Sequence, residues 1–360
     1  MLFNRKYFAL LVLLALFSFA CESAVEEERE QRGPDPSTAI AHWEESSLAN
    51  YDISQLIAKG EEEKSGVPAN AVITSHFQNW LAANGYSAYD FARTDITGGS
   101  YGGKTSNSTP VNRQPVIFIH GNSDKAVGTQ FGQSGWTESL NYFLNQGYTQ
   151  AELYAFTWGD ADASSAGNNY HSKEYVIHVR KFIEAVLAYT GASKVDIVAH
   201  SMGVTLSRKA VKGGSGFDPN DGGSYFVGAA LSNSVDTFIG IAGGNQGLVN
   251  CYYASSVPTC DDVNGFYPGY LWGWYGPYGV SDYLVDLNAT SAYEGDYRYS
   301  IWSAADQIVG YSCLVYGVNT CKLPIQTGQK AYSTAPYGHF NVKDLPTAVQ
   351  YQMLVNHVVI

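Results

Sequence analysis

The chain has 360 residues, of which 45% are hydrophobic and only 15% are charged, and its formal net charge at pH 7 is −12. This composition can bury a large core, which excludes an intrinsically disordered protein. The negative charge, without any cluster of Lys or Arg, excludes nucleic acid as a partner, because neutralised phosphates supply most of the affinity for nucleic acid.

The first 20 residues have the features of a secretory signal peptide. Arg5 and Lys6 precede an uncharged apolar run that ends at Ala20. The run is too short to span a bilayer comfortably, and an acidic stretch follows it in place of a stop-transfer sequence. We therefore expect the protein to be secreted. Cys21, directly after Ala20, also resembles a bacterial lipoprotein cleavage site, so a lipid anchor on Cys21 stays open.

Two segments are expected before the main domain, which spans residues 91–360. Residues 21–38 contain three consecutive glutamates and two prolines, and such a polar stretch cannot bury enough apolar area to fold. We expect an acidic linker there. Residues 39–90 are expected to form a helical extension, because their apolar residues recur at helical spacing. These residues are Val72, Ile73, Phe77, Trp80 and Leu81.

Downstream of an irregular loop predicted for residues 98–110, apolar runs alternate with helical patterns. An apolar stripe from Tyr175 to Leu187 predicts a helix, and residues 342–359 predict a closing helix. This alternation is typical of a mainly parallel sheet with helices on both faces. The predicted strands are Val116–Ile119, Glu152–Trp158, Lys194–Ala199, Phe238–Ala242 and Tyr297–Ser303.

The third predicted strand runs directly into a serine between small residues. The sequence Ala199-His-Ser201-Met-Gly203 is typical of a nucleophile elbow, in which strand and helix pack so closely that a large residue beside the serine would clash. An ordinary helix N-cap would explain Ser201 but not Ala199 and Gly203 together. Ser201 is therefore the candidate nucleophile.

Such a serine needs an acid and then a histidine later in the chain. Only His339 and His357 lie late enough, and His339 is preferred because it precedes the closing helix, whereas His357 is expected on that helix. Asp306 is the candidate acid because it follows the predicted strand that ends at Ser303. The alternatives, none of which ends a strand, are Asp282, Asp286 and Asp296.

Two backbone N–H groups would have to bind the oxyanion of the reaction. Met202 supplies one, and Asn122, which follows the strand ending in His120-Gly121, supplies the other. This chemistry requires no cofactor. No metal is expected either, because the acidic turn at residues 218–222 lacks the third oxygen ligand and the distal glutamate of a calcium loop.

The four cysteines besides Cys21 fall into two close pairs, Cys251 with Cys260 and Cys313 with Cys321. Three pairings are possible for four cysteines. The short loops favour a disulfide within each pair in an oxidising compartment. A structural zinc site is disfavoured, because neither pair has the spacing of such a site.

Residues 243–297 form a long insertion rich in tyrosine and tryptophan. These rings either pack within a loop-rich cap or form a platform that adheres to an apolar surface in water. On the second interpretation, the partner is a hydrophobic polyester or lipid surface. The candidate surface residues are Tyr252, Tyr253, Tyr270, Trp272 and Trp274.

Several runs of the chain carry a family resemblance. They are Pro115-Val-Ile-Phe-Ile-His-Gly-Asn122, Asn168-Asn-Tyr-His171, Val195-Asp-Ile-Val-Ala-His-Ser-Met-Gly-Val204, Ala242-Gly-Gly-Asn-Gln-Gly-Leu248, Cys251-Tyr-Tyr253 and Gly338-His-Phe340. Together they resemble extracellular bacterial depolymerases of amorphous poly(3-hydroxybutyrate). More distantly, the elbow resembles that of small secreted class 2 lipases of the Bacillus type.

The resemblance spans residues 90 to 357 and implies a single-domain α/β-hydrolase fold. It also implies Ser201, Asp306 and His339 as a catalytic triad, two disulfides, and a tyrosine surface in place of a separate binding domain. The chain departs from the depolymerase pattern in two places. The stretch between Asp306 and His339 is shorter, and residues 22–90 have no counterpart. Both departures concern the substrate surface rather than the triad.

We therefore expect an α/β-hydrolase catalytic domain with helices on both faces of its sheet and an aromatic-rich cap insertion. The expected function is a secreted serine ester hydrolase that depolymerises a short-chain polyhydroxyalkanoate. The alternative is a triacylglycerol lipase or carboxylesterase. A non-catalytic adhesion module would lack one member of the triad, and all three are present. No obligate protein partner is evident from the sequence.

Overall fold

The computed structural model describes residues 66–360. The signal peptide, the acidic linker, Cys21 and the first part of the helical extension lie outside these residues and stay predictions. Within residues 66–360, no helix combines the length and the apolar character needed to cross a bilayer.

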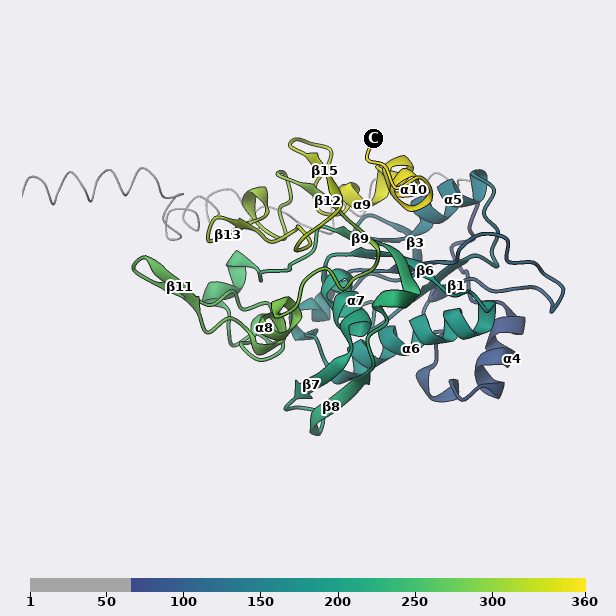
Figure 1. The fold of residues 1–360 in the computed structure, drawn as a ribbon, viewed down its shortest axis with the longest axis horizontal. Helices are drawn as coiled ribbons and strands as arrows, with labels where there is room; N and C mark the ends of the chain where they lie inside the picture. The colour runs from purple at the N-terminus through teal and green to yellow at the C-terminus, as the bar shows by residue number, and fades with distance from the viewer. Residues whose placement is uncertain (1–65) are drawn as a thin grey trace, which may run out of the picture. The chain divides into compact units, whose positions relative to one another are not determined.

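A seven-stranded sheet in the order β1-β5-β2-β6-β9-β12-β15 forms the centre of the domain (Figure 1). β1 is antiparallel to β5, and every other neighbouring pair is parallel. The predicted, mainly parallel sheet is therefore confirmed. The strands are β1 (Ser100–Tyr101), β2 (Val116–Ile119), β5 (Leu153–Phe156), β6 (Val195–His200), β9 (Val235–Ile241), β12 (Tyr297–Ser303) and β15 (Gly328–Tyr332).

The five predicted strands correspond to β2, β5, β6, β9 and β12, whereas β1 and β15 were not predicted. β1 lies within residues 98–110, so the prediction of an irregular loop over that whole stretch is wrong. β1 consists of two residues, which pair with the edge of β5, and so short a strand leaves no period-two pattern. β15 is an edge strand whose side chains are only partly buried, which is why its sequence lacks an apolar run.

Helices cover both faces of the sheet, as Figure 1 shows. One core contains side chains from α4, α6, α7 and α8 with Ile117 and Ile119 of β2. The other contains side chains from α5, α9 and α10 with Val116 and Phe118 of the same strand. The alternation of β2 between the two cores follows from the period of two in a strand. The helices are α4 (Ser75–Ala83), α5 (Thr137–Asn145), α6 (Lys173–Thr190), α7 (Met202–Lys212), α8 (Asp282–Asn288), α9 (Asn341–Asp344) and α10 (Thr347–Val355).

The predicted closing helix is divided into α9 and α10. Pro346 separates them, because proline lacks the N–H that would continue the helical hydrogen bonds. The helix also ends at Val355, so the prediction that His357 lies on it is wrong. His357 has a positive φ of 53°, a left-handed backbone conformation that cannot continue the helix.

α4 lies in the region where a helix was predicted from the apolar spacing. Its Phe77 and Leu81 are buried, and Phe77 stacks on Tyr189 of α6 at a ring distance of 4.2 Å. The same ring meets Tyr154 of β5 edge-on at 5.6 Å. α4 is therefore packed into the same core as the sheet.

Within residues 66–360, four two-stranded hairpins lie outside the central sheet. The turn at residues 218–222 joins β7 to β8, and the Asp218 carboxylate accepts hydrogen bonds from the backbone N–H groups of Lys173 and Asn220. The predicted turn is therefore confirmed. The hairpins are β3–β4 (Val127–Gln130, Gln133–Gly135), β7–β8 (Gly214–Asp218, Gly223–Gly228), β10–β11 (Tyr270–Trp272, Tyr275–Tyr278) and β13–β14 (Leu314–Val315, Val318–Asn319).

Candidate active site

Ser201 lies at the sharp turn between β6 and α7. Its φ of 53° and ψ of −127° are values that a residue with a side chain rarely adopts, as expected for a strained elbow. Two contacts hold this conformation. The Ser201 N–H donates to the Ile241 carbonyl at 2.8 Å, and Gly203 lies so close to β2 that a Cβ there would be 2.2 Å from the His120 carbonyl oxygen. The small residue after the serine is therefore a packing requirement.

Ser201, His339 and Asp306 come together in one hydrogen-bonded chain. His339 Nε2 lies 3.0 Å from Ser201 Oγ, and His339 Nδ1 lies 2.7 Å from Asp306 Oδ2. The aspartate and the histidine are each 2% exposed. With the Nδ1 proton donated to the carboxylate, Nε2 is left as an acceptor for the serine proton. The arrangement can therefore transfer a proton from Ser201 to His339.

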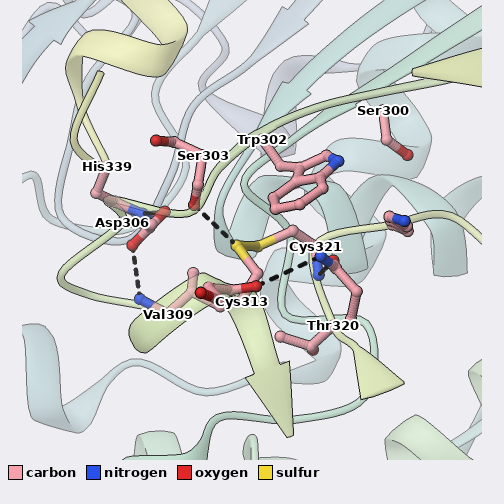
Figure 2. Close-up of a disulfide and its surroundings, with 12 residues drawn as sticks. Ser300, Trp302, Ser303, Asp306, Val309, Cys313, Thr320, Cys321 and His339 are labelled. Atoms are coloured by element: carbon pink, nitrogen blue, oxygen red, sulfur yellow. Dashed lines mark hydrogen bonds and ion pairs between the residues drawn. A yellow bond between two sulfur atoms is a disulfide. The ribbon is translucent and has the colours of Figure 1, made fainter. Parts of the chain in front are cut away.

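Asp306 is held in a loop directly after β12 by backbone groups of the same loop. Its Oδ1 accepts hydrogen bonds from the N–H groups of Ile308 at 2.9 Å and Val309 at 2.8 Å, which leaves Oδ2 for His339. Figure 2 shows the Cys313–Cys321 disulfide beside this loop, with Cys313 Sγ 3.5 Å from the Ser303 carbonyl oxygen. The disulfide thus packs beside the end of β12 and the loop that holds Asp306.

His339 is also fixed through its backbone. Its N–H donates to Gln307 Oε1 at 3.0 Å, and its carbonyl accepts a hydrogen bond from His200 Nε2 at 2.9 Å. Burial holds the pKa of His200 well below its usual value, so this imidazole stays neutral and donates from Nε2. His200 was not among the predicted site residues. Its place beside Ser201 in the elbow is the one sequence signal that could have pointed to it.

The residues considered as alternatives lie in other interactions. His357 stacks on Tyr297 at a ring distance of 3.6 Å and lies 3.1 Å from an Asp236 carboxylate oxygen. Asp286 pairs with two lysines of α7, and Asp296 pairs with Lys194. Asp282 lies in the first turn of α8.

The turn that carries Asn122 lies against the nucleophile. A Cβ on Gly121 would be 2.8 Å from Ser201 Cβ, so only glycine allows this approach. Within residues 66–360, the backbone N–H groups of Asn122 and Met202 have no hydrogen-bond partner. The Met202 N–H directly follows Ser201 in the chain, and the Asn122 N–H follows Gly121, the residue that packs against Ser201. They are therefore available to an oxyanion formed at the serine.

The Asn122 side chain is held by a network that sequence reasoning missed. Its Nδ2 donates to the Ala166 carbonyl at 2.8 Å, and its Oδ1 accepts from Asn169 Nδ2 at 2.7 Å. Tyr175 in turn donates to Asn169 Oδ1 at 3.1 Å. Asn169 belongs to one of the runs that carry the family resemblance, but nothing in that run indicates its contact with a loop 47 residues away.

The predicted surface residues are exposed, with one exception. Tyr253, Tyr270, Trp272 and Trp274 are exposed, Trp272 to 76%, whereas Tyr252 is half-buried. The last three of these four belong to the β10–β11 hairpin, which extends away from the sheet in Figure 1. Two further exposed rings of this hairpin, which were not predicted as surface residues, are Tyr275 and Tyr278.

Both disulfides form within the predicted pairs, Cys251–Cys260 and Cys313–Cys321. Across the described residues, the one cluster with candidate metal ligands is Asp306 with Cys313 and Cys321. Those two cysteines are joined in a disulfide, so they cannot bind a metal as thiolates.

The domain has a mainly parallel sheet with helices on both faces. A serine lies on a strained strand-to-helix turn, and a buried His–Asp pair is hydrogen-bonded to it. These features define an α/β-hydrolase. The sequence model of the class 2 lipases matches residues 113–352. The chain belongs to the class 2 lipase family, which is a family of carboxylic ester hydrolases.

Three solved lipase structures are similar to parts of this chain. Aspergillus fumigatus lipase B is 15% identical with a TM-score of 0.45, and the match covers 85% of this chain and 65% of that one. A Bacillus licheniformis lipase in its propeptide form is 12% identical with a TM-score of 0.44, covering 72% of this chain and 53% of that one. The monoacylglycerol lipase of Paleococcus ferrophilus is 13% identical with a TM-score of 0.41, and the match covers 72% of this chain and 98% of that one. The chain thus spans less than two thirds of the first two proteins.

Proposed function

We propose that the protein is a secreted serine ester hydrolase that depolymerises a short-chain polyhydroxyalkanoate such as poly(3-hydroxybutyrate). The observation that carries the proposal is the chain of contacts from Ser201 Oγ to His339 at 3.0 Å and from His339 to Asp306 at 2.7 Å. A serine, a histidine and a buried carboxylate hydrogen-bonded in this order are the arrangement that acyl transfer requires.

The reaction proceeds in two halves. His339 takes the Ser201 proton as Oγ attacks the ester carbonyl carbon, and the N–H groups of Asn122 and Met202 bind the oxyanion. The imidazolium, stabilised by Asp306, then gives its proton to the leaving alcohol oxygen, which leaves an acyl-serine. Water attacks this acyl-enzyme by the same route and releases the acid. No cofactor takes part in either half.

A polymer surface as substrate is supported by the exposed rings of the β10–β11 hairpin and Tyr253. Tyrosine and tryptophan present an apolar face with a polar edge, which suits the boundary between water and a polyester. The two disulfides agree with an oxidising, extracellular location. A second candidate, a triacylglycerol lipase or carboxylesterase, is favoured by the match to the class 2 lipases.

The substrate is tested with the protein lacking residues 1–21, on an emulsion of amorphous poly(3-hydroxybutyrate) beside a tributyrin emulsion. We expect clearing of the polyester that is faster than tributyrin turnover and lost in Ser201→Ala. Cleavage of tributyrin with the polyester intact would instead identify a lipase or esterase. A folded protein that cleaves neither the polyester nor tributyrin would contradict the proposed ester hydrolase function.

The surface is tested by Trp272→Ala combined with Tyr275→Ala. We expect weaker adsorption to polyester particles in a sedimentation assay, with hydrolysis of soluble p-nitrophenyl butyrate unchanged, because these rings lie on the hairpin and not at Ser201. Phe226→Ala is the matched control, since Phe226 is 70% exposed like Tyr275 but lies on β8. Equal adsorption of all three proteins would contradict a role for the hairpin.

A further inference from the structure

A buried lysine lies one turn after His339. Lys343 of α9 is 1% exposed, and its Nζ donates to Asp124 Oδ2 at 3.0 Å, to Ser134 Oγ at 3.0 Å and to the Gly135 carbonyl. Because the Val342 N–H donates to the Gly338 carbonyl at 2.9 Å, α9 is continuous with the backbone of the histidine. Lys343 therefore ties the histidine segment to residues more than 200 positions earlier in the chain.

Asp124, the partner of Lys343, lies in the turn that presents Asn122. The Asp124 N–H donates to the Gly121 carbonyl at 3.3 Å, which closes this turn. Its Oδ1 accepts hydrogen bonds from the N–H groups of Lys125 at 2.8 Å and Gly135 at 3.0 Å, while Oδ2 binds Lys343. One carboxylate therefore fixes the oxyanion turn, the β4 strand and α9 relative to one another.

We propose that the Lys343–Asp124 ion pair is a positioning device that sets the oxyanion turn at its working distance from His339. The proposal rests on the serine hydrolase function proposed above, and it adds two residues that do not themselves touch substrate. The pair connects the segment that carries the general base with the turn that carries the second oxyanion donor.

The positive charge of Lys343 is retained inside the protein. Burial by itself lowers the pKa of Lys343, but the Asp124 and Asp344 carboxylates together raise that pKa above its usual value. A buried ion pair contributes little net stability compared with apolar residues of the same volume. Its directional hydrogen bonds, however, allow one arrangement of the two segments, whereas apolar packing tolerates shifts.

Oxyanion donors must be placed within about 0.5 Å to bind the transition state well. Loss of one donor lowers kcat on the order of 100-fold to 1000-fold, while substrate binding in the ground state is little changed. If the ion pair positions Asn122, its removal should therefore lower kcat much more than it changes KM.

The experiment compares the protein lacking residues 1–21 with Lys343→Met and with the double variant Asp124→Asn, Lys343→Met. The double variant removes the Asp124 charge together with the Lys343 charge, so it tests the proposal if the single variant fails to fold. Its asparagine Oδ1 can still accept from Lys125 and Gly135. Asp344, which also pairs with Lys343 at 3.3 Å, keeps the hydrogen bond from Ser134 Oγ at 2.7 Å. The measured quantities are kcat and KM for p-nitrophenyl butyrate, and the inhibition constant of a short-chain trifluoromethyl ketone, whose serine adduct carries an oxyanion.

Lys209→Met is the matched control. Lys209 is 2% exposed and pairs with Asp286 at 2.7 Å, so its loss also removes a buried lysine and its ion pair, but this pair joins α7 to α8. Asp286 keeps a second partner in Lys212 at 2.9 Å. Any general effect of losing a buried lysine should therefore be seen in Lys209→Met as well.

We expect the Lys343 variants to lose about 100-fold in kcat with KM within about 2-fold, and the ketone to bind more weakly by a similar factor. Labelling of Ser201 by a fluorophosphonate in the parent protein establishes the serine hydrolase function separately. Wild-type kcat in the folded double variant would overturn the positioning role, and so would an equal loss of kcat in Lys209→Met. A parent protein that neither hydrolyses the ester nor reacts with the fluorophosphonate would refute the proposed function instead.

Discussion

Asp306 uses its two carboxylate oxygens for different partners. Oδ1 accepts from two backbone N–H groups, and Oδ2 binds His339. An amide at this position would keep its oxygen toward the N–H groups and turn its NH₂ toward the histidine. His339 would then have to accept at Nδ1 and carry its proton on Nε2, where it could not act as a base for Ser201.

Asp306→Asn should therefore lower kcat by about 10⁴-fold, because His339 is held in the wrong tautomer. Tm should change little, because the number of hydrogen bonds at residue 306 stays the same. Steady-state hydrolysis of p-nitrophenyl butyrate and thermal unfolding measure the two quantities. A variant with more than a tenth of the parent kcat would show that Asp306 is not the acid.

Gly121→Ala tests the contact between the oxyanion turn and the nucleophile. The new Cβ would lie 2.8 Å from Ser201 Cβ and 3.0 Å from His200 Nδ1, so the turn has to move away. We expect kcat to fall on the order of 100-fold to 1000-fold, as for loss of one oxyanion donor. Gly167→Ala is the control, since its Cβ would meet only Val257 Cγ1 at 3.3 Å. Equal kcat values for the two variants would show that the close contact with Ser201 is not the reason for a glycine at position 121.

At the scale of elements, the two disulfides close loops of nearly equal length but serve different segments. Cys313–Cys321 packs beside the loop that holds Asp306, whereas Cys251–Cys260 lies in the aromatic insertion. Loop length alone gives each a stabilisation of about 2.5 kcal/mol in the chain-entropy account. Loss of either disulfide should therefore lower the free energy of unfolding by a similar amount, whereas kcat should differ between the two variants.

Replacing Cys313 and Cys321 by serine should lower kcat on the order of 10-fold, because the acid loses part of its support. Replacing Cys251 and Cys260 by serine should leave kcat for a soluble ester unchanged. Urea unfolding checks that both variants lose similar stability. A selective loss of kcat in the Cys251–Cys260 variant would contradict this assignment of roles.

Most elements around the site were predictable because their patterns are local. β2 and β6 are buried at every position, so their sequences, apart from Asp196 and His200 of β6, are apolar and can be recognised without the fold. β15 was missed because an edge strand has no such run, although it completes the sheet beside β12. The closing helix was predicted as one helix through residue 359, because its apolar residues continue on both sides of Pro346 and past Val355. The structure divides it at Pro346 and ends it at Val355.

At the scale of the whole molecule, buried histidines make stability depend on pH. Burial lowers the pKa of His120 to about 4 and that of His171 to about 3. In the unfolded chain, both would titrate near about 6.5. As the pH falls below that value, these histidines bind protons in the unfolded state but not in the folded state. The free energy of unfolding therefore decreases until the pH approaches the folded pKa values.

His171→Phe should reduce the slope of unfolding free energy against pH by about 0.7 kcal/mol per unit at pH 6.5 and by about 1.4 kcal/mol per unit near pH 5, where the unfolded histidine is almost fully protonated. Phenylalanine keeps the ring packing on Tyr283, where the centroids are 4.0 Å apart. Urea unfolding at several pH values gives the slope. A slope equal to that of the parent would show that His171 does not stay neutral in the folded protein.

The sequence by itself determined the elbow at Ser201, the parallel strands and the pairing of the cysteines, and it predicted His339 and Asp306 as the partners of the serine. Each of these follows from short-range patterns: small residues at a tight turn, apolar runs, chain order and loop length. The tertiary structure alone decided the support of these residues. Lys343 contacts Asp124, 219 residues away, and Asn169 contacts Asn122, because packing and not sequence distance selects the partner of a buried polar group.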